Sequence, residues 1–341
     1  MGDHSLVAGL LKYGLASAFV RRVTPDRAFP EAPKITLPWA QSPELVPTPE
    51  LPALDLYPPG RYLRQPVCRM PVPCGRVLEG VTWYPPQGVL LDARNRAIED
   101  AHQVPMRTHW YDWRAFFPRQ VEDMDGACFV FRSFRQSYYH LLTDHLPALY
   151  SLGVLPWASD ERVKLLLPAP LSAAERHLLP KICPGNVEIV EVAADRSYRL
   201  QRCYFVSHLA QRGCGYLPGW YLAEFLRRVA PRRPRERTRR IYIARTGSAG
   251  RRIVNEAELT ARLERLGFEA YALEKLPVAQ QIELFHDAET VVAPHGAGLA
   301  NLLFAENARV LELFEGPLLR PHYFFMSKAR GHAYAWLRGR D

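Results

Sequence analysis

Residues 290–301 constrain the fold most, because they read as a buried strand that runs into a glycine-rich turn and then a helix. Val291 and Val292 favour a strand, while Gly296 and Gly298 let backbone N–H groups come close to a ligand. A helix N-terminus carries unpaired N–H donors and about half a positive charge. The pattern therefore predicts an anion site suited to a diphosphate, although such turns also serve merely as tight connections.

Strands and helices alternate through residues 241–314. The expected strands are 241–244, 268–273, 291–293 and 310–314, and the expected helices are 255–266 and 278–288. Parallel β–α units bind ligands beyond the carboxyl ends of their strands, at the point where the strand order reverses. The pattern therefore places Arg245, Glu274 and His295 near one rim of a parallel sheet, with Glu312 not far away. Asn255 and Glu258 predict a capping box for the first of these helices.

The rest of the chain predicts a second α/β layer. At 341 residues the chain is long enough for two domains, and short strand-like and helical runs alternate from about 77 to 209, which favours a largely parallel sheet. Residues 24–75 are rich in proline and predict an extended arm. The basic run 231–240 predicts a boundary in the form of a charged linker, since it has no interleaved aromatics for stacking on bases.

The charge and the cysteines indicate the kind of partner and the compartment. The net charge of +9 comes overwhelmingly from arginine, so an anionic partner is expected: nucleic acid, a nucleotide sugar or an anionic glycan. The six cysteines are scattered without a Cys-x-x-Cys pair, which favours reduced thiols and a cytoplasmic location. Residues 6–20 predict an amphipathic helix, which either packs on the protein's own core or touches the inner face of a membrane.

The loop from Arg245 to Glu256 contains Arg251 and Arg252, and these cations are able to close on a phosphate or to form a solvated basic loop. Glu312 lies in an otherwise apolar strand, where an unpaired carboxylate is costly. We expect it to bind either a ribose diol or an arginine.

His140 and Asp144 are four residues apart and share a helix face, and Pro147 would loosen the turn beside them. Such a pair is able to accept the proton of an attacking hydroxyl, although this spacing also stabilises plain helix surfaces. Asp123 and Asp125 match the Asp-x-Asp metal motif of sugar transferases, but their place before a strand argues against that role.

Several motifs together resemble glycosyltransferase family 61. They are Tyr-Tyr-His-Leu-Leu-Thr-Asp-His-Leu-Pro at 138–147, Arg245 with the segment 251–256, Leu-Gly-Phe at 266–268, Glu274 with Leu284 and Phe285, and Pro-His-Gly-Ala-Gly-Leu-Ala-Asn at 294–301. Residues 322–332 are also similar to the closing helix of that family.

The resemblance implies an α/β fold of the GT-B type, with two Rossmann-like domains facing across a cleft. The domains expected are an N-terminal helix and arm (1–75), an acceptor-side domain (76–230), a basic linker (231–240), a nucleotide-sugar-binding domain (241–316) and a closing helix (317–341). Asp144 is expected as the base with His140 as its orienter, although a second histidine, His145, leaves that choice open. The expected nucleotide-sugar ligands are Arg245, Arg251, Asn255, Glu274, His295, Gly296, Ala297, Gly298 and Glu312.

The activity implied is inverting transfer from a UDP-sugar to a hydroxyl of a glycan or glycolipid, with no cofactor and no metal, in the synthesis of a surface polysaccharide. Two alternatives remain: a basic protein that binds nucleic acid through residues 231–240, and a glycan-binding protein that keeps the fold without catalysis.

Overall fold

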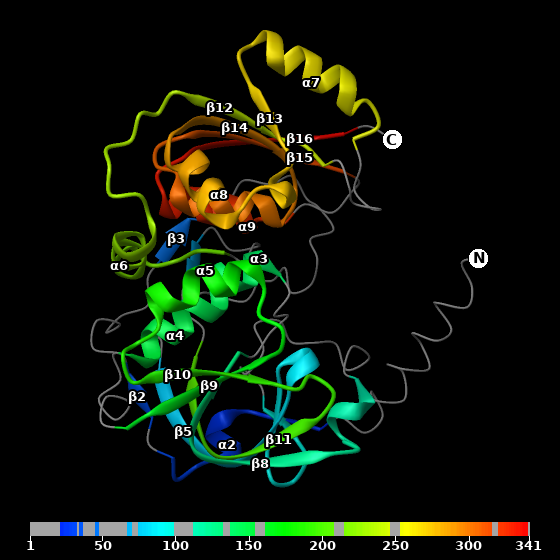
Figure 1. Cartoon of the computed structure of the whole chain (residues 1–341), viewed down its shortest axis with the longest axis vertical. Coiled ribbons are helices and arrows are strands. Elements are labelled where there is room, and N and C mark those ends of the chain that lie inside the picture. Colours follow the sequence, from blue (N-terminus) through cyan, green and yellow to red (C-terminus); the bar gives the residue numbers. More distant parts are fainter. Residues whose placement is uncertain are drawn as a thin grey trace, which may run out of the picture. The chain divides into compact units, whose positions relative to one another are not determined.

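The computed structural model describes most of the chain and divides it into two compact units (Figure 1). The described residues are 21–32, 34–36, 45–47, 67–69, 74–98, 112–131, 137–153, 161–207, 215–245, 253–315 and 320–339. The expected helix at 6–20 lies outside them. Unit 1 comprises Met1–Pro43, Pro71–Glu175 and Cys183–Arg212, and unit 2 comprises Glu44–Met70, Arg176–Ile182 and Gly213–Asp341. None of the described helices is long and apolar enough to cross a bilayer.

Unit 1 is built on a nine-stranded sheet with the order β1-β7-β6-β5-β11-β8-β9-β10, in which β2 also pairs with β5. Its strands are β1 (Arg22–Val23), β2 (Ile35–Thr36), β5 (Cys74–Tyr84), β6 (Val89–Leu91), β7 (Ala97–Ile98), β8 (Val121–Val130), β9 (Val163–Pro168), β10 (Val187–Val192) and β11 (Ser197–Val206). Its core includes Leu78, Trp83, Tyr198 and Phe205, all within 2% exposed.

The expectation of a largely parallel sheet in this unit is correct only for part of it. β11, β8, β9 and β10 are parallel, but β5 is antiparallel to both β11 and β6. The short 3₁₀ turn η2 (Pro85–Gln87) and Gly88, at φ 64°, reverse the chain between β5 and β6, too short a connection for a parallel crossover.

The proline-rich segment, predicted as an extended arm, contributes short strands to this sheet. β1 pairs with β7 and β2 pairs with β5, on either side of the short helix α2 (Pro25–Ala28). Arg76 of β5 donates to the Ala32 carbonyl at 2.7 Å and also pairs with Asp26. Further along the arm, β3 (Leu45–Pro47) pairs with β4 (Val67–Arg69).

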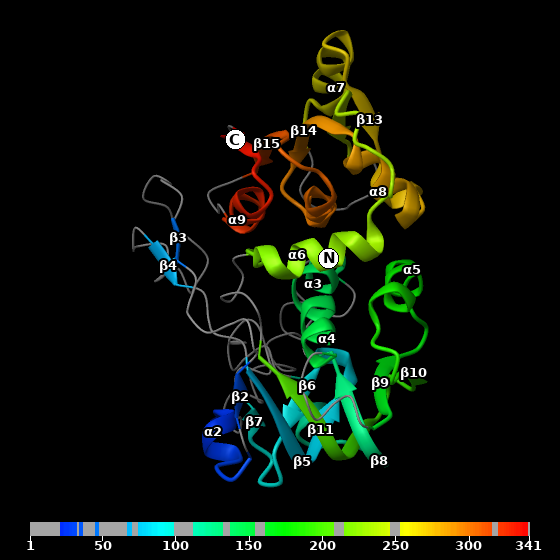
Figure 2. The same ribbon diagram turned by 90° about the vertical axis from the view of Figure 1, so that its left-hand side faces the viewer.

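Unit 2 contains a five-stranded, wholly parallel sheet with the order β13-β12-β14-β15-β16. The strands are β12 (Arg239–Ile243), β13 (Glu269–Tyr271), β14 (Ala288–Pro294), β15 (Arg309–Phe314) and β16 (Ala333–Arg338). The helices are α6 (Gly219–Val229), α7 (Glu256–Arg265), α8 (Val278–His286) and α9 (His322–Ala329), with short 3₁₀ helices η7 (Leu273–Lys275) and η8 (Ala297–Phe304). In Figures 1 and 2, α8 and α9 lie on the same side of this sheet and α7 stands apart from them beside β13. The strand order reverses between β12 and β14, which is the position where doubly wound folds bind ligands.

The C-terminal segment differs from the expected closing helix. α9 ends at Ala329, Gly331 turns the chain at φ 70°, and residues 333–338 form β16, which pairs with β15 along its length. β16 is the last strand in the order and therefore an edge among the described strands. The exposure of its alternate residues Ala333, Ala335 and Leu337 shows that one of its faces meets solvent.

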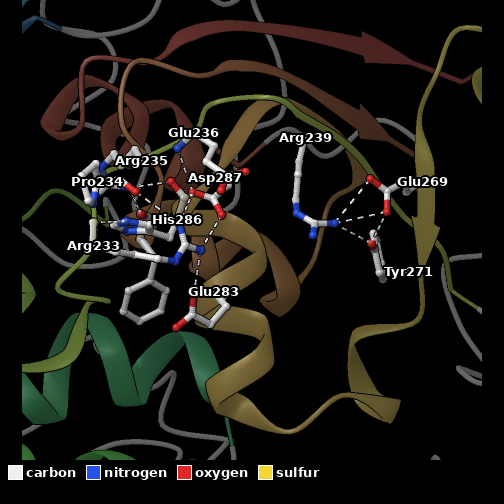
Figure 3. Close-up of polar contacts among 11 residues, drawn as sticks. Arg233, Pro234, Arg235, Glu236, Arg239, Glu269, Tyr271, Glu283, His286 and Asp287 are labelled. Atoms are coloured by element: carbon white, nitrogen blue, oxygen red, sulfur yellow. Dashed lines mark hydrogen bonds and ion pairs between the residues drawn. The ribbon is translucent and has the colours of Figure 1, made fainter.

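The arginine strap, as we call residues 231–240, is bound to unit 2 by its guanidinium groups (Figure 3). Arg233 pairs with Asp287 at 2.6 Å and Glu283 at 2.8 Å, and Arg239 lies 3.3 Å from the Glu269 carboxylate. The other bonds of the strap join Arg235 to the carbonyls of His286 and Phe304, Arg237 to Glu306, and Arg240 to Glu289 and the Leu266 carbonyl. These pairings hold the run against the sheet and its helices, although most of its residues remain exposed. The role of the run as a linker between domains stays a prediction.

Candidate active site

Arg245 and the glycine turn meet at the point where the strand order of unit 2 reverses. Arg245 follows β12 and Gly296 follows β14, which are neighbouring parallel strands. The contact is so close that a Cβ built on Gly296 would overlap the Arg245 guanidinium, with Cζ only 2.9 Å away. Gly296 itself is extended, at φ 170°, so its missing side chain serves this contact. The predicted neighbourhood of Arg245 and Gly296 is therefore present in the structure.

Glu256, at the start of α7, is hydrogen-bonded to the end of β12 and the residue beyond it. Its Oε1 accepts a hydrogen bond from the Arg245 backbone N–H at 2.9 Å and from the Tyr242 hydroxyl at 3.0 Å. Burial and the neighbouring Glu256 raise the pKa of Tyr242, which keeps its hydroxyl protonated as a donor. The sequence assigned no role to Glu256, although it stands in the quoted motif.

The capping box expected at the start of α7 is not formed. Asn255 occupies the N-cap position without a side-chain cap bond, and Glu258 pairs instead with Arg262 at 3.5 Å. Asn255 itself is exposed. Arg251 lies outside the described residues, so its predicted role in holding the donor stays a prediction.

Side-chain amides of Asn301 and Gln281 form hydrogen bonds that link the glycine turn to η7. Asn301 is fully buried and donates to the Gln281 side chain and to the Gly298 carbonyl, both at 3.1 Å. Gln281 in turn donates to the carbonyls of Leu273 and Leu276, at the two ends of η7.

Three expected ligands occupy different surroundings around that turn. Ala297 is exposed at the start of η8, where the first N–H groups of a helix lack intrahelical acceptors. Gly298 is packed on apolar atoms, since its added Cβ would lie 3.1 Å from Leu273 Cδ1. Glu274 is exposed in η7, just beyond the carboxyl end of β13.

His295, Glu312 and Tyr334 form a chain of hydrogen bonds across three neighbouring strands. His295 Nδ1 lies 2.5 Å from Glu312 Oε1, and the Tyr334 hydroxyl donates to Glu312 Oε2 at 2.6 Å. The Glu312 side chain is fully buried, whereas 11% of the His295 side chain is exposed. Both oxygens of Glu312 are thus engaged by protein groups, and these partners are a histidine and a tyrosine in place of the arginine considered. Binding of a ribose diol by Glu312 stays a prediction.

The surroundings of this chain explain its electrostatics. Burial raises the pKa of Glu312 to about 8, and the hydrogen bond from Tyr334 acts in the opposite direction. The His295 ring stacks on Phe314 at 5.1 Å between centroids and lies 5.5 Å from Tyr323 and 6.0 Å from His322.

Two tyrosines of this site were missed at the sequence level. The Tyr323 hydroxyl donates to the Gly296 carbonyl at 2.6 Å, and Tyr334 reaches Glu312 from β16. Tyr323 lies in α9, where a helix was expected, but its contact with Gly296 is 27 residues distant along the chain. Tyr334 was missed because residues 333–338 were expected to be helical, and a helix would not place it in register beside β15.

Unit 1 contains the predicted pair of titratable groups. His140 Nδ1 lies 2.6 Å from Asp144 Oδ2, and the Thr143 hydroxyl lies 2.7 Å from Asp144 Oδ1. The Asp144 side chain is fully buried, whereas 19% of the His140 side chain is exposed. The pair therefore meets solvent through its imidazole, and the carboxylate sits behind it.

The backbone around this pair is loosened as predicted. Tyr138–His140 form one α-helical turn (α3), Leu141–His145 a π-helical turn (η5), and Leu146–Leu152 the helix α4. Pro147 lacks the N–H that would bond to the residue 143 carbonyl, which favours the wider turn before it. Single π-turns inside helices occur often at functional sites.

Two other polar residues considered from the sequence, His145 and Asp123, contact groups of unit 1. His145 is 2% exposed and stacks on Phe131 at 4.4 Å between centroids. Asp123 lies within β8 and pairs with Arg199 at 3.1 Å.

The sequence matches the family model described as Glycosyltransferase 61 over residues 138–311, just over half of the chain. The chain belongs to glycosyltransferase family 61. The matched region contains His140, Asp144, Arg245 and the 295–298 turn, but it ends one residue before Glu312.

Individual proteins also match parts of the chain. The EGF domain-specific O-linked N-acetylglucosamine transferase of Drosophila melanogaster is 32% identical over 114 residues, which is 32% of this chain and 21% of that protein. The chain thus spans about a fifth of that relative's length. Among solved structures, the iron-containing dodecameric glycosyltransferase TibC from enterotoxigenic E. coli H10407 matches with a TM-score of 0.30 and 14% identity, over 57% of this chain and 59% of that one.

Proposed function

We propose that the protein is a glycosyltransferase that uses a UDP-sugar, works with inversion at the anomeric carbon and needs no metal. Its acceptor would be a hydroxyl of a glycan or glycolipid, in the synthesis of a surface polysaccharide at the cytoplasmic face of a membrane. The GT-B arrangement, with two such units facing across a cleft, belongs to the same proposal. The relative that acts on EGF domains adds a protein hydroxyl as a second class of acceptor to test.

The contact between Arg245 and Gly296 supports the donor assignment most strongly. A guanidinium group binds phosphate oxygens in pairs, and here it lies against a glycine turn that opens the helix η8. The position at the strand-order reversal is the usual ligand position of a doubly wound sheet. Together these groups would stabilise the negative charge that develops on a departing nucleoside diphosphate.

The burial of Asp144 favours His140 as the group that accepts the proton. A carboxylate with a fully buried side chain does not reach an acceptor hydroxyl, while the partly exposed imidazole would do so. Asp144 would then fix the orientation of the ring and stabilise its protonated form. This assignment exchanges the roles expected from the sequence, in which Asp144 was the base.

The donor assignment is tested by titrating UDP into the protein in the presence of EDTA, using calorimetry. We expect binding in the wild type and its loss in Arg245→Ala, with Arg232→Ala as a control because Arg232 is an exposed arginine of the strap. Wild-type protein that fails to bind UDP, or that binds it only with a divalent ion, contradicts the proposal. Proton NMR of the product's anomeric signal then distinguishes inversion from retention.

The nucleic-acid alternative loses support from the arginine strap. The guanidinium groups of Arg233, Arg239 and Arg240 are already paired with carboxylates of unit 2. Steep salt-dependent binding of oligonucleotides would restore that alternative. The non-catalytic alternative predicts UDP binding without turnover of any UDP-sugar.

A further inference from the structure

The strand-crossing chain of His295, Glu312 and Tyr334 has no role in the function proposed so far. It occupies the carboxyl end of β14, one residue before the turn that meets Arg245. A buried carboxylate with a histidine on one oxygen and a tyrosine on the other is a costly arrangement for purely structural packing. An apolar strand would accommodate a leucine at position 312 without that cost.

We propose that Glu312 and Tyr334 are positioning residues that supply His295 with a proton, so that His295 becomes a cation facing the departing diphosphate. This inference rests on the proposed function, because it requires a nucleoside diphosphate at the glycine turn. The positive charge on His295 would form as the bond to the diphosphate breaks, when negative charge develops on the leaving group.

The geometry carries the inference. Glu312 engages Nδ1 of the imidazole, so the nitrogen that would meet a ligand is Nε2, on the opposite edge of the ring. Stacking on Phe314 and the neighbouring Tyr323 hold the plane of the ring. The Tyr323 hydroxyl also holds the Gly296 carbonyl, which fixes the turn relative to the ring.

The proton balance is internal to the pair. The bond between the anomeric carbon and the diphosphate oxygen breaks, and its electron pair stays on that oxygen. The proton shared between Glu312 and Nδ1 then moves toward the imidazole, and the ring faces the new negative charge as an imidazolium. The acceptor hydroxyl forms the new bond to the anomeric carbon and gives its proton to the base, so nothing enters from outside.

The other charged and titratable groups around His295 set the pH dependence. They are Glu312 on β15, Tyr334 on β16, His322 and Tyr323 on α9, and Arg245 beside Gly296. Burial raises the pKa of Glu312 to about 8, so the pair keeps its proton through neutral pH and loses it as the pH rises further. The cation is then no longer formed, and kcat/KM should fall on the alkaline side.

Tyr334→Phe tests the positioning role without removing the carboxylate. The tyrosine hydroxyl stabilises the ionised form of Glu312, so its loss makes Glu312 hold the proton more strongly. We expect the alkaline limb of kcat/KM to move up by about one pH unit and kcat to fall about tenfold. Tyr271→Phe is the matched control, since the Tyr271 hydroxyl contacts Glu269 and Arg239 on another strand. A Tyr334→Phe enzyme with the wild-type pH profile overturns the inference, because a merely structural tyrosine would change stability alone.

A second measurement needs no turnover. The ¹⁵N NMR signals of His295, assigned by comparison with His295→Asn, report the protonation of its ring before and after addition of UDP. We expect UDP to shift the ring toward the imidazolium in the wild type but not in Glu312→Gln, whose fold is checked by circular dichroism. UDP that binds without changing the His295 signals overturns this inference alone, whereas UDP that does not bind overturns the donor assignment as well.

Discussion

Adding a single methyl group at Gly296 should weaken UDP binding without lowering the stability of the fold. In Gly296→Ala the new Cβ overlaps the Arg245 guanidinium, and the flexible arginine side chain moves in preference to the backbone. The extended conformation at φ 170° and ψ 171° suits alanine, and the hydrogen bond from Tyr323 to the residue 296 carbonyl is unaffected. Stability should therefore stay close to that of the wild type.

The loss in affinity follows from the guanidinium–phosphate bond that is displaced. A hydrogen bond to a charged group contributes about 1.5–3 kcal/mol, and each 1.4 kcal/mol is tenfold in affinity. The Kd for UDP should rise about 10-fold to 150-fold by calorimetry, with an unchanged urea midpoint. Gly219→Ala is the control, because a Cβ at Gly219 meets no atom within 4 Å.

A double variant shows whether the effect passes through Arg245. If it does, Gly296→Ala adds little to Arg245→Ala, because neighbours that act through one contact are not additive. Wild-type affinity in Gly296→Ala, or a double variant whose loss equals the sum of the two single losses, would refute the reasoning.

Three further predictions concern the base, the loop and the strap. His140→Gln and Asp144→Asn should each lower kcat by about 10²- to 10⁴-fold at unchanged UDP affinity, and the double variant should be no slower than the worse single one; losses that multiply would show two independent roles. Tyr242→Phe removes one hydrogen-bond donor from Glu256 and should raise the Kd for UDP about 3-fold to 10-fold, with Tyr271→Phe as the comparison. An unchanged Kd would mean that UDP binding does not depend on the hydrogen bond between Tyr242 and Glu256. Arg233→Ala should lower the urea midpoint at pH 7, whereas Arg232→Ala should not. Because Arg233 lowers the pKa of Asp287, the stability that this ion pair contributes is present above the ordinary aspartate pKa of 3.8 and is lost as the pH falls below that value. A loss of stability in Arg233→Ala that persists at low pH would show that it does not come from the ion pair.

Local patterns in the sequence predicted the parts of the site that depend on local geometry. The alternation at 241–314 and the turn at 296 placed Arg245 beside the glycine turn, because parallel strands end at one edge of a sheet. The spacing of His140 and Asp144 likewise gave their contact. Both predictions depend on the spacing of nearby residues and on the preference of glycine for turns, and these can be recognised in a single sequence.

Long-range pairing accounts for what the sequence did not predict. Whether residues 333–338 continue a helix or join β15 is decided by the open edge of the sheet, which lies outside the local pattern. The partner of Glu312 was missed for the same reason, since Tyr334 is 22 residues further along the chain. The pairing of the arginine strap with unit 2 was likewise not predicted, because the carboxylates that pair with it come from distant segments.

The first and last residues of the family match are poor boundaries for expressing part of this protein. A fragment cut at residues 138–311 would end inside β15, before Glu312, and would lack β16 and α9. β14 would then have only a shortened neighbour on one side, an exposed strand edge of the kind that promotes aggregation. Boundaries for expression should follow the hydrogen-bonded sheet, through at least Arg338, in preference to the bounds of the family match.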